Sequence, residues 1–230
     1  MAMSRRQETP TLTRVTRYGM VNAYLVREDD GLTVVDTGIP KSERFLLAAA
    51  QELGAPIVRI LLTHAHADHV GSLDALAAEL PEAEVLISTR DARLLAGDMS
   101  FDPGEPATKM RGGFAEVQTT PTRTLSPGDR VGSLEVVAAP GHTVGQIALL
   151  DVRDRTLLCA DAFTTWGAVT TSAQPNWRFP LSTMATWDRP IALESARALR
   201  DLRPARLAPG HGKVVADPVP AMDRAIAKAA

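Results

Sequence analysis

All five histidines of this 230-residue chain lie in short motifs that are typical of metal binding. Three of them fall within the H-x-H-x-D-H segment from His64 to His69, which also contains Asp68. The fourth, His142, follows a Pro-Gly pair, and the fifth, His211, lies between two glycines. Imidazole is the commonest metal ligand in proteins. The chain is therefore predicted to fold around a metal centre.

A structural role without metal would be unfavourable for the H-x-H-x-D-H segment. Three imidazoles packed together repel one another when they are protonated, and they bury polar groups without partners when they are neutral. An isolated histidine is more often a surface or core residue with ordinary hydrogen-bond partners. The prediction of a metal centre therefore rests on the close spacing of the histidines and the aspartate in this segment. Asp161 ends the apolar run 156–160 and is a further ligand candidate.

The candidate ligand atoms are imidazole nitrogens and carboxylate oxygens, and this donor set favours zinc, with iron or manganese as alternatives. His64 and His66 are two residues apart, so an extended segment would point both toward one ion. Asp68 and His69 follow where the chain turns into a helix, and can face a second position. A carboxylate such as Asp161 has two oxygens and can bridge two ions.

The full candidate set is too large for one tetrahedral ion. It suits two metal ions, each with positions left open for water, which is the catalytic arrangement. The candidate metal ligands are His64, His66, Asp68, His69, His142, Asp161 and His211.

Composition and charge exclude several functional classes. A hydrophobic content of 45% is sufficient for a sizeable core, and the net charge of −2 without a basic stripe argues against nucleic acid as a partner. No apolar run approaches the roughly 18 residues of a membrane span, and the first ten residues lack the apolar region of a signal peptide. The single cysteine, Cys159, excludes an intrachain disulfide. A cytoplasmic protein with a small-molecule substrate is predicted.

Hydrophobic periodicity predicts alternating strands and helices. Strand-like runs cover residues 21–26, 32–35, 57–62, 84–88, 134–138, 147–152, 156–160 and 206–208. Helical patterns cover residues 41–53, a stretch that starts just after His69 and stops at Pro81, residues 89–96, a stretch that opens at Asp188, and residues 221–230. Asp30-Gly31 indicates a hairpin, and Gly54 is placed to cap a helix. This alternation indicates sheets covered by helices, with the ligand candidates converging at one sheet edge.

Residues 97–120 interrupt this regular pattern with Gly, Pro and charge. An irregular stretch of this length is often functional, so it is predicted to be a flap that shapes the substrate pocket. Its scattered large apolar residues are Met99, Phe101, Met110 and Phe114. The alternative is a surface loop whose apolar residues pin it to the core.

The set of motifs resembles the metallo-β-lactamase fold superfamily. The resemblance rests on the H-x-H-x-D-H segment, the P-G-H-T-x-G-Q segment at 140–146, the strand end at Asp161 and the final G-H-G. It extends from the V-V-D-T-G strand end at 34–38 to His211, nearly the whole chain. It implies an α/β (α+β) fold, a four-layer αββα sandwich of two mixed β-sheets flanked by helices, in one domain over residues 1–230.

The resemblance also implies how the ligands divide between two metal ions. Metal 1 would take His64, His66 and His142, metal 2 would take Asp68, His69 and His211, and Asp161 would bridge both. Asp36 would support the metal-binding loop without binding metal.

A dinuclear metal-dependent hydrolase is the leading functional hypothesis. Two metal ions would lower the pKa of a bridging water enough to give hydroxide near neutral pH, and this hydroxide would attack a small ester, thioester, lactone or lactam. Asp68 is the predicted catalytic residue, which orients the water and assists proton transfer. The alternative is a mononuclear iron persulfide dioxygenase, an oxidoreductase in which Asp68 and His211 would be free of metal. A metal-binding protein without catalysis is disfavoured because the ligand set is complete.

Several other residues lie close to these motifs. Thr63 and Thr143 flank ligands and could hold imidazoles in place, or simply pack. Cys159 precedes Asp161 by two residues, so it is predicted to share a strand face with it and to be a buried small hydrophobe. The large side chains after Asp161 would either line a substrate pocket or close the core; they are Trp166, Trp177, Met184 and Trp187.

Overall fold

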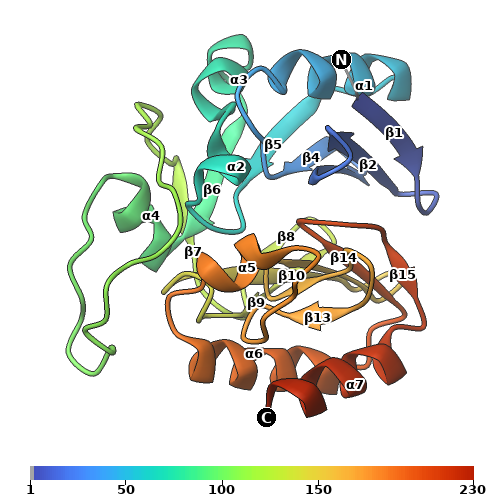
Figure 1. Ribbon diagram of the computed structural model, residues 1–230. Helices are drawn as coiled ribbons and strands as arrows, with labels where there is room; N and C mark the ends of the chain where they lie inside the picture. The colour runs from blue at the N-terminus through green and yellow to red at the C-terminus, as the bar shows by residue number, and fades with distance from the viewer. Residues whose placement is uncertain (1–2) are drawn as a thin grey trace.

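The computed structural model describes residues 3–230 and has four layers (Figure 1). Two mixed β-sheets pack against each other, and helices cover the outer face of each. This confirms the four-layer αββα sandwich that the motifs imply.

The first sheet has seven strands in chain order, β1 to β7. Neighbours from β1 to β4 are antiparallel, and the pairs from β4 to β7 are parallel. The strands are β1 (Met3–Gln7), β2 (Leu12–Arg17), β3 (Val21–Glu28), β4 (Gly31–Val35), β5 (Ile57–Leu61), β6 (Glu84–Ser88) and β7 (Arg123–Leu125).

The second sheet has the strand order β15-β14-β11-β10-β9-β8, and only its β11–β14 pair is parallel. Its strands are β8 (Arg130–Val131), β9 (Leu134–Ala138), β10 (Ile147–Asp151), β11 (Thr156–Ala160), β14 (Arg206–Pro209) and β15 (Val215–Ala216). A separate two-stranded ribbon joins β12 (Phe163–Thr164) and β13 (Thr170–Thr171).

The helices fall into two outer layers and two short segments. The layer on the first sheet contains α1 (Glu43–Leu53), α3 (Leu73–Glu79) and α4 (Thr89–Leu95). The layer on the second sheet contains α6 (Arg189–Asp201) and α7 (Val219–Ala229). The short helices are α2 (Ala67–Val70) and α5 (Pro180–Met184). No helix of residues 3–230 is long and apolar enough to cross a bilayer.

Alternation along the strands builds the layers. In β5, Ile60 belongs to the apolar cluster beneath α1 and α3, whereas Leu61 belongs to the cluster between the sheets. In β11, Leu158 packs between the sheets, whereas Leu157 and Cys159 pack with side chains of α6 and α7. Because successive side chains of a strand point to opposite faces, one apolar run supplies two layers of the core.

Several local predictions are confirmed. The hairpin between β3 and β4 forms, with Asp29–Asp30 as its two-residue turn. Gly54 caps α1 in the left-handed conformation. Asp188 caps α6 by accepting a hydrogen bond from the Ile191 backbone N–H.

The N-terminal part of the first sheet differs from the sequence prediction, because β1 and β2 precede the first predicted strand. Their strand signal is weak, since β1 is exposed throughout and β2 buries two arginines. Arg14 is paired with Glu8 at 2.9 Å, and the Arg17 guanidinium lies over the Phe45 ring. Ion pairing and ring stacking therefore bury residues that look solvent-exposed in the sequence.

One helical prediction is wrong in detail, and one short helix was not predicted. The helix predicted after His69 forms as two pieces, α2 and α3, separated by Gly71 and Ser72. The short helix α5 was not predicted, because its five residues are too few to show a helical period.

The prediction that Cys159 and Asp161 share a strand face is wrong. The register of β11 against β14 shifts between Leu158 and Ala160, and Ala160 has a φ of 47°. Because this irregularity rotates the strand end, Cys159 stays in the outer apolar cluster while Asp161 turns toward His69.

We expect the Cys159→Ala variant to lose about 1 kcal/mol of unfolding free energy, because it removes one buried sulfur atom from a packed layer. Its metal content should equal that of the wild type. Urea denaturation and elemental analysis of both proteins check this. Loss of one metal equivalent would instead make Cys159 a ligand.

Candidate metal centre

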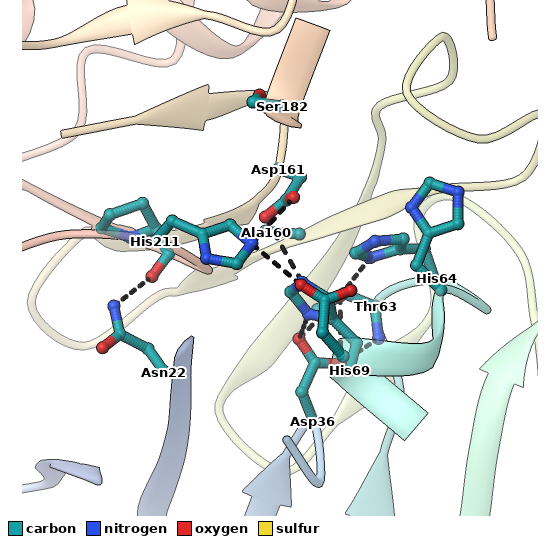
Figure 2. Close-up of polar contacts among 12 residues, drawn as sticks. Asn22, Asp36, Thr63, His64, His69, Ala160, Asp161, Ser182 and His211 are labelled. Carbon is teal, nitrogen blue, oxygen red and sulfur yellow. Dashed lines mark hydrogen bonds and ion pairs between the residues drawn. The ribbon is translucent and has the colours of Figure 1, made fainter. Parts of the chain in front are cut away.

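The seven side chains predicted as ligands converge at the ends of strands from both sheets. Residues 64–69 follow β5 of the first sheet, whereas Asp161 and His211 follow β11 and β14 of the second. Figure 2 shows Asp161 and His211 approaching from one side and His64 and His69 from the other. The cluster therefore spans the edge where the two sheets meet.

Each imidazole has one ring nitrogen held by the protein. His64 Nδ1 lies 3.0 Å from the Thr63 hydroxyl, which itself donates to Asp36 and so accepts from the ring. His69 Nδ1 donates to Asp36 Oδ2 at 2.8 Å. His142 Nδ1 lies 3.0 Å from Thr186 Oγ1.

Backbone carbonyls hold the other two rings. His66 Nε2 lies 2.9 Å from the Arg111 carbonyl oxygen, and His211 Nδ1 lies 3.0 Å from that of Met20. Since a carbonyl only accepts, each of these nitrogens carries the proton. In the neutral form of each ring, the opposite nitrogen then has a lone pair directed into the cluster, as a metal ligand requires.

These free nitrogens face one another inside the cluster. His66 Nδ1 lies only 3.0 Å from His142 Nε2. Among the described residues, His64 Nε2, His69 Nε2 and Asp161 Oδ1 are buried and have no hydrogen-bond partner. Buried polar atoms are rarely left without a partner, so a cation fits the space that these atoms surround.

The ligand atoms form three overlapping groups, and within each group all of them lie within 4.8 Å of one another. The groups are His64–His66–His142, His64–His69–Asp161 and Asp68–His69–His211. The Asp161 carboxylate connects them, because its oxygens lie 3.3 Å from His142 Nε2, 3.4 Å from His69 Nε2 and 3.2 Å from His211 Nε2.

The imidazoles fall into two groups, one with a lowered pKa and one with a raised pKa. Burial lowers the pKa of His64 and His66, and lowers that of His142 to about 3, so these rings are neutral at pH 7. Burial also opposes protonation of His69 and His211, but nearby carboxylates, Asp161 first among them, outweigh it. The pKa of His211 rises to about 10. The carboxylate side of the cluster thus demands positive charge, which protons or metal ions can supply.

Asp36 contacts the metal-binding loop as predicted. Its carboxylate accepts hydrogen bonds from the Thr63 backbone N–H, the Thr63 hydroxyl and His69 Nδ1. Asp36 thereby fixes His69 directly and His64 through the threonine hydroxyl.

Asp91 was missed by the sequence reasoning. Its buried carboxylate accepts from the Ala65 N–H at 2.9 Å, the Thr143 hydroxyl at 2.7 Å and the Gly145 N–H at 2.7 Å. Thr143 therefore bonds a carboxylate and not an imidazole, which corrects its predicted role. Asp91 ties the loop that carries His64 and His66 to the loop that carries His142.

Asn22 was also missed, and it holds the His211 loop from the opposite sheet. Its side-chain amide donates to the carbonyls of Pro209 and Gly212, and its backbone N–H donates to that of Gly210. Neither Asn22 nor Asp91 has a sequence signal, because each acts on backbone groups far away along the chain.

A cavity of about 470 Å³ opens beside the cluster. Five of the candidate ligands reach its wall, namely His66, Asp68, His142, Asp161 and His211. The Asp68 side chain is 41% exposed, whereas that of Asp161 is 5% exposed. Asp68 is therefore the carboxylate that a bound molecule would meet.

The segment 97–120 contributes Gly112 and Gly113 to this cavity. A Cβ atom at Gly112 would lie 2.2 Å from His66 Nε2, so glycine lets the chain pass over this ring. Met99, Met110 and Phe114 pack against the core beneath the helices of the first sheet. These contacts agree with the alternative prediction, a surface loop whose apolar residues attach it to the core. That this segment moves as a flap stays a prediction.

Of the large side chains after Asp161, Met184 and Trp187 take the two predicted roles. Met184 lines the cavity, whereas Trp187 is buried and stacks on Phe101 with ring centroids 6.1 Å apart. Trp166 stacks on Phe179, which in turn lines the cavity. Trp177 is 83% exposed and does neither.

We expect Asp91→Asn to destabilise the fold, because an amide offers one acceptor oxygen where the carboxylate uses both. The loss should be about 1–3 kcal/mol, the usual effect of leaving a buried donor unpaired. Burial raises the pKa of Asp91 to about 6, so urea denaturation at pH 8 compares the ionised wild type with the variant. Asp29→Asn, at the exposed hairpin turn, is the matched control. Equal midpoints for all three proteins would contradict the role of Asp91.

Known proteins share both the sequence pattern and the fold. Uncharacterized protein YobT of Bacillus subtilis (strain 168) is 45% identical over 210 residues, which cover 91% of this chain and 90% of YobT. The crystal structure of TTHA1623 in a di-iron-bound form has a TM-score of 0.66 and 28% identity, covering 89% of this chain and 93% of that one.

A second solved structure, DIM-1 metallo-beta-lactamase exposed to ceftazidime, has a TM-score of 0.75 at 15% identity, covering 100% of this chain and 97% of that one. At this identity the likeness shows the fold alone. The family model of the metallo-beta-lactamase superfamily matches residues 16–211, a range that contains every candidate ligand. This protein therefore belongs to the metallo-beta-lactamase superfamily.

Proposed function

We propose that this member of a superfamily of metal-dependent hydrolases uses two metal ions to hydrolyse a small ester, thioester, lactone or lactam. The observation that carries the proposal is the double set of ligand atoms, which share the Asp161 carboxylate and border the 470 Å³ cavity. A cavity of this size suits a small molecule. The cytoplasmic location inferred from the sequence stays a prediction.

The proposed ligand assignment follows the free lone pairs. His64 Nε2, His66 Nδ1 and His142 Nε2 would hold the first ion. Asp68, His69 and His211 would hold the second, and Asp161 would bind both. The donor set favours zinc. Since TTHA1623 was solved in a di-iron-bound form, iron is the principal alternative, with manganese behind it.

Two bound ions would lower the pKa of a water molecule and polarise the substrate carbonyl as Lewis acids. The side chains of the protein would position the water molecule and assist the transfer of its proton. Burial opposes ionisation of Asp68, but His69 and His211 outweigh it and hold its pKa well below the usual range. The Asp68 carboxylate is thus ionised at neutral pH and lies at the wall of the cavity, where it would orient a water molecule and assist its deprotonation.

Elemental analysis of protein purified without added metal should give close to two ions per chain, most of them zinc. Two irons per chain would keep the dinuclear site and change only the metal. One iron with little zinc would overturn the hydrolase proposal in favour of a mononuclear persulfide dioxygenase, in which Asp68 and His211 bind no metal.

The variant Asp68→Asn should lose turnover far more than stability. Asparagine keeps the shape of the side chain but cannot accept a proton, and general-base loss typically costs about 100- to 10,000-fold in rate. Rates on a hydrolysed ester, metal content and urea denaturation should be measured together, with Asp29→Asn as control. Near-normal turnover with both metals retained would remove Asp68 from the mechanism.

A further inference from the structure

The part of the cavity wall that the candidate ligands and two glycines do not form is apolar except for Ser182. It is formed by the turn before β3 and by the segment that contains α5, and its apolar lining residues are Met20, Val21, Phe179, Leu181, Met184 and Ala185. Phe179 is fixed between the Trp166 ring at 5.7 Å and the His211 ring at 4.7 Å. The wall is therefore anchored to the rest of the site.

Much of this apolar wall faces water. Leu181 is 56% exposed and Met184 is 63% exposed, whereas the leucines of the second sheet are buried. The two residues are three positions apart on α5, so they lie on the same side of the helix. Met20, which is 37% exposed, adds a third apolar side chain to the cavity wall. Contiguous exposed apolar surface at a cavity is typical of a ligand-binding wall.

Lysine and arginine are absent from the described lining of this cavity, and its charged groups outside the imidazoles are the carboxylates of Asp68 and Asp161. Arg14 and Lys213 line a different cavity, where Arg14 is already paired with Glu8 at 2.9 Å. A carboxylate or phosphate on a substrate arm that lies away from the candidate ligands would therefore find no lysine or arginine beside it.

From this wall we infer that the substrate is an uncharged acyl compound, an ester, thioester or lactone, whose apolar chain lies against Leu181 and Met184. This inference rests on the proposed function, because it places the acyl carbon at the ligand cluster. In hydrolysis, water adds its oxygen to the acyl carbon, the bond to the leaving oxygen or sulfur breaks, and that atom takes a proton. Only the chain beyond the acyl carbon would contact α5.

A binding experiment tests the wall without requiring turnover. Methyl ketones present a carbonyl that the enzyme cannot hydrolyse, so their Kd values can be measured by calorimetry on the metal-loaded protein. We expect 2-octanone to bind at least about tenfold more tightly than 2-butanone, because each buried methylene favours binding by up to about fourfold. We expect 8-hydroxy-2-octanone, which has the same chain length and a terminal hydroxyl that does not prefer an apolar wall, to bind at least about tenfold more weakly than 2-octanone.

The double variant Leu181→Asn/Met184→Gln keeps the size of both side chains and makes them polar. It should remove most of the preference for 2-octanone over 2-butanone. Both positions are largely exposed, so the fold should tolerate the change. The matched control is Met3→Gln, at an exposed methionine in β1 outside the cavity, and it should leave both Kd values unchanged.

Equal binding of the short and long ketones, or tighter binding of 8-hydroxy-2-octanone than of 2-octanone, would overturn the inference. A preference for 2-octanone that survives in the double variant would also overturn it. Hydrolysis of 4-nitrophenyl acetate and octanoate is measured in parallel and tests the proposed function separately. Ketone binding as expected without turnover of any ester, thioester or lactone would count against the proposed hydrolase and not against the apolar wall.

Discussion

The interaction on which the site depends is the contact between the buried Asp161 carboxylate and three imidazoles. A carboxylate that is nearly inaccessible to water is costly unless positive charge lies beside it. His69, His142 and His211 lie within 3.4 Å of its oxygens, and His69 and His142 have their other nitrogens fixed by side chains. The surrounding hydrogen bonds therefore keep ring nitrogens pointed at one carboxylate, as a metal site requires.

The same contacts fasten the two sheets together at this edge. Asp161 and His211 come from the second sheet and His69 from the first. Asn22 and Tyr24 of β3 reinforce the junction, because both side chains donate to the Pro209 carbonyl that precedes the His211 loop. Away from this edge, apolar side chains of both sheets pack in a central cluster that includes Leu61 and Leu158. At the far end of β3, Glu28 adds polar contacts between the sheets through Ser133 and Arg153.

Much of the fold and the candidate site could be predicted from the sequence, because residue types alone identify the candidate ligands and the alternation of apolar and polar positions in strands. The positions of His64, His66 and Asp161 at strand ends followed from that pattern. The contacts of Asp91 and Asn22 could not be predicted, since both bind backbone groups that only the folded chain brings near. The prediction that Cys159 shares a strand face with Asp161 was wrong, because a shift in register near Ala160 interrupts the alternation of side chains along the strand.

Strand positions and loop positions of this chain differ in how many amino-acid substitutions they can tolerate. Strand positions such as Ile60 and Leu61 need only an apolar side chain of suitable volume, and many residue types satisfy that requirement. Gly112 and His66, in contrast, fit each other so closely that even one added carbon would collide with the ring. Substitutions can therefore accumulate across the framework while the loops at one edge stay constrained. Such tolerance is compatible with the fold that this chain shares with DIM-1 at 15% identity.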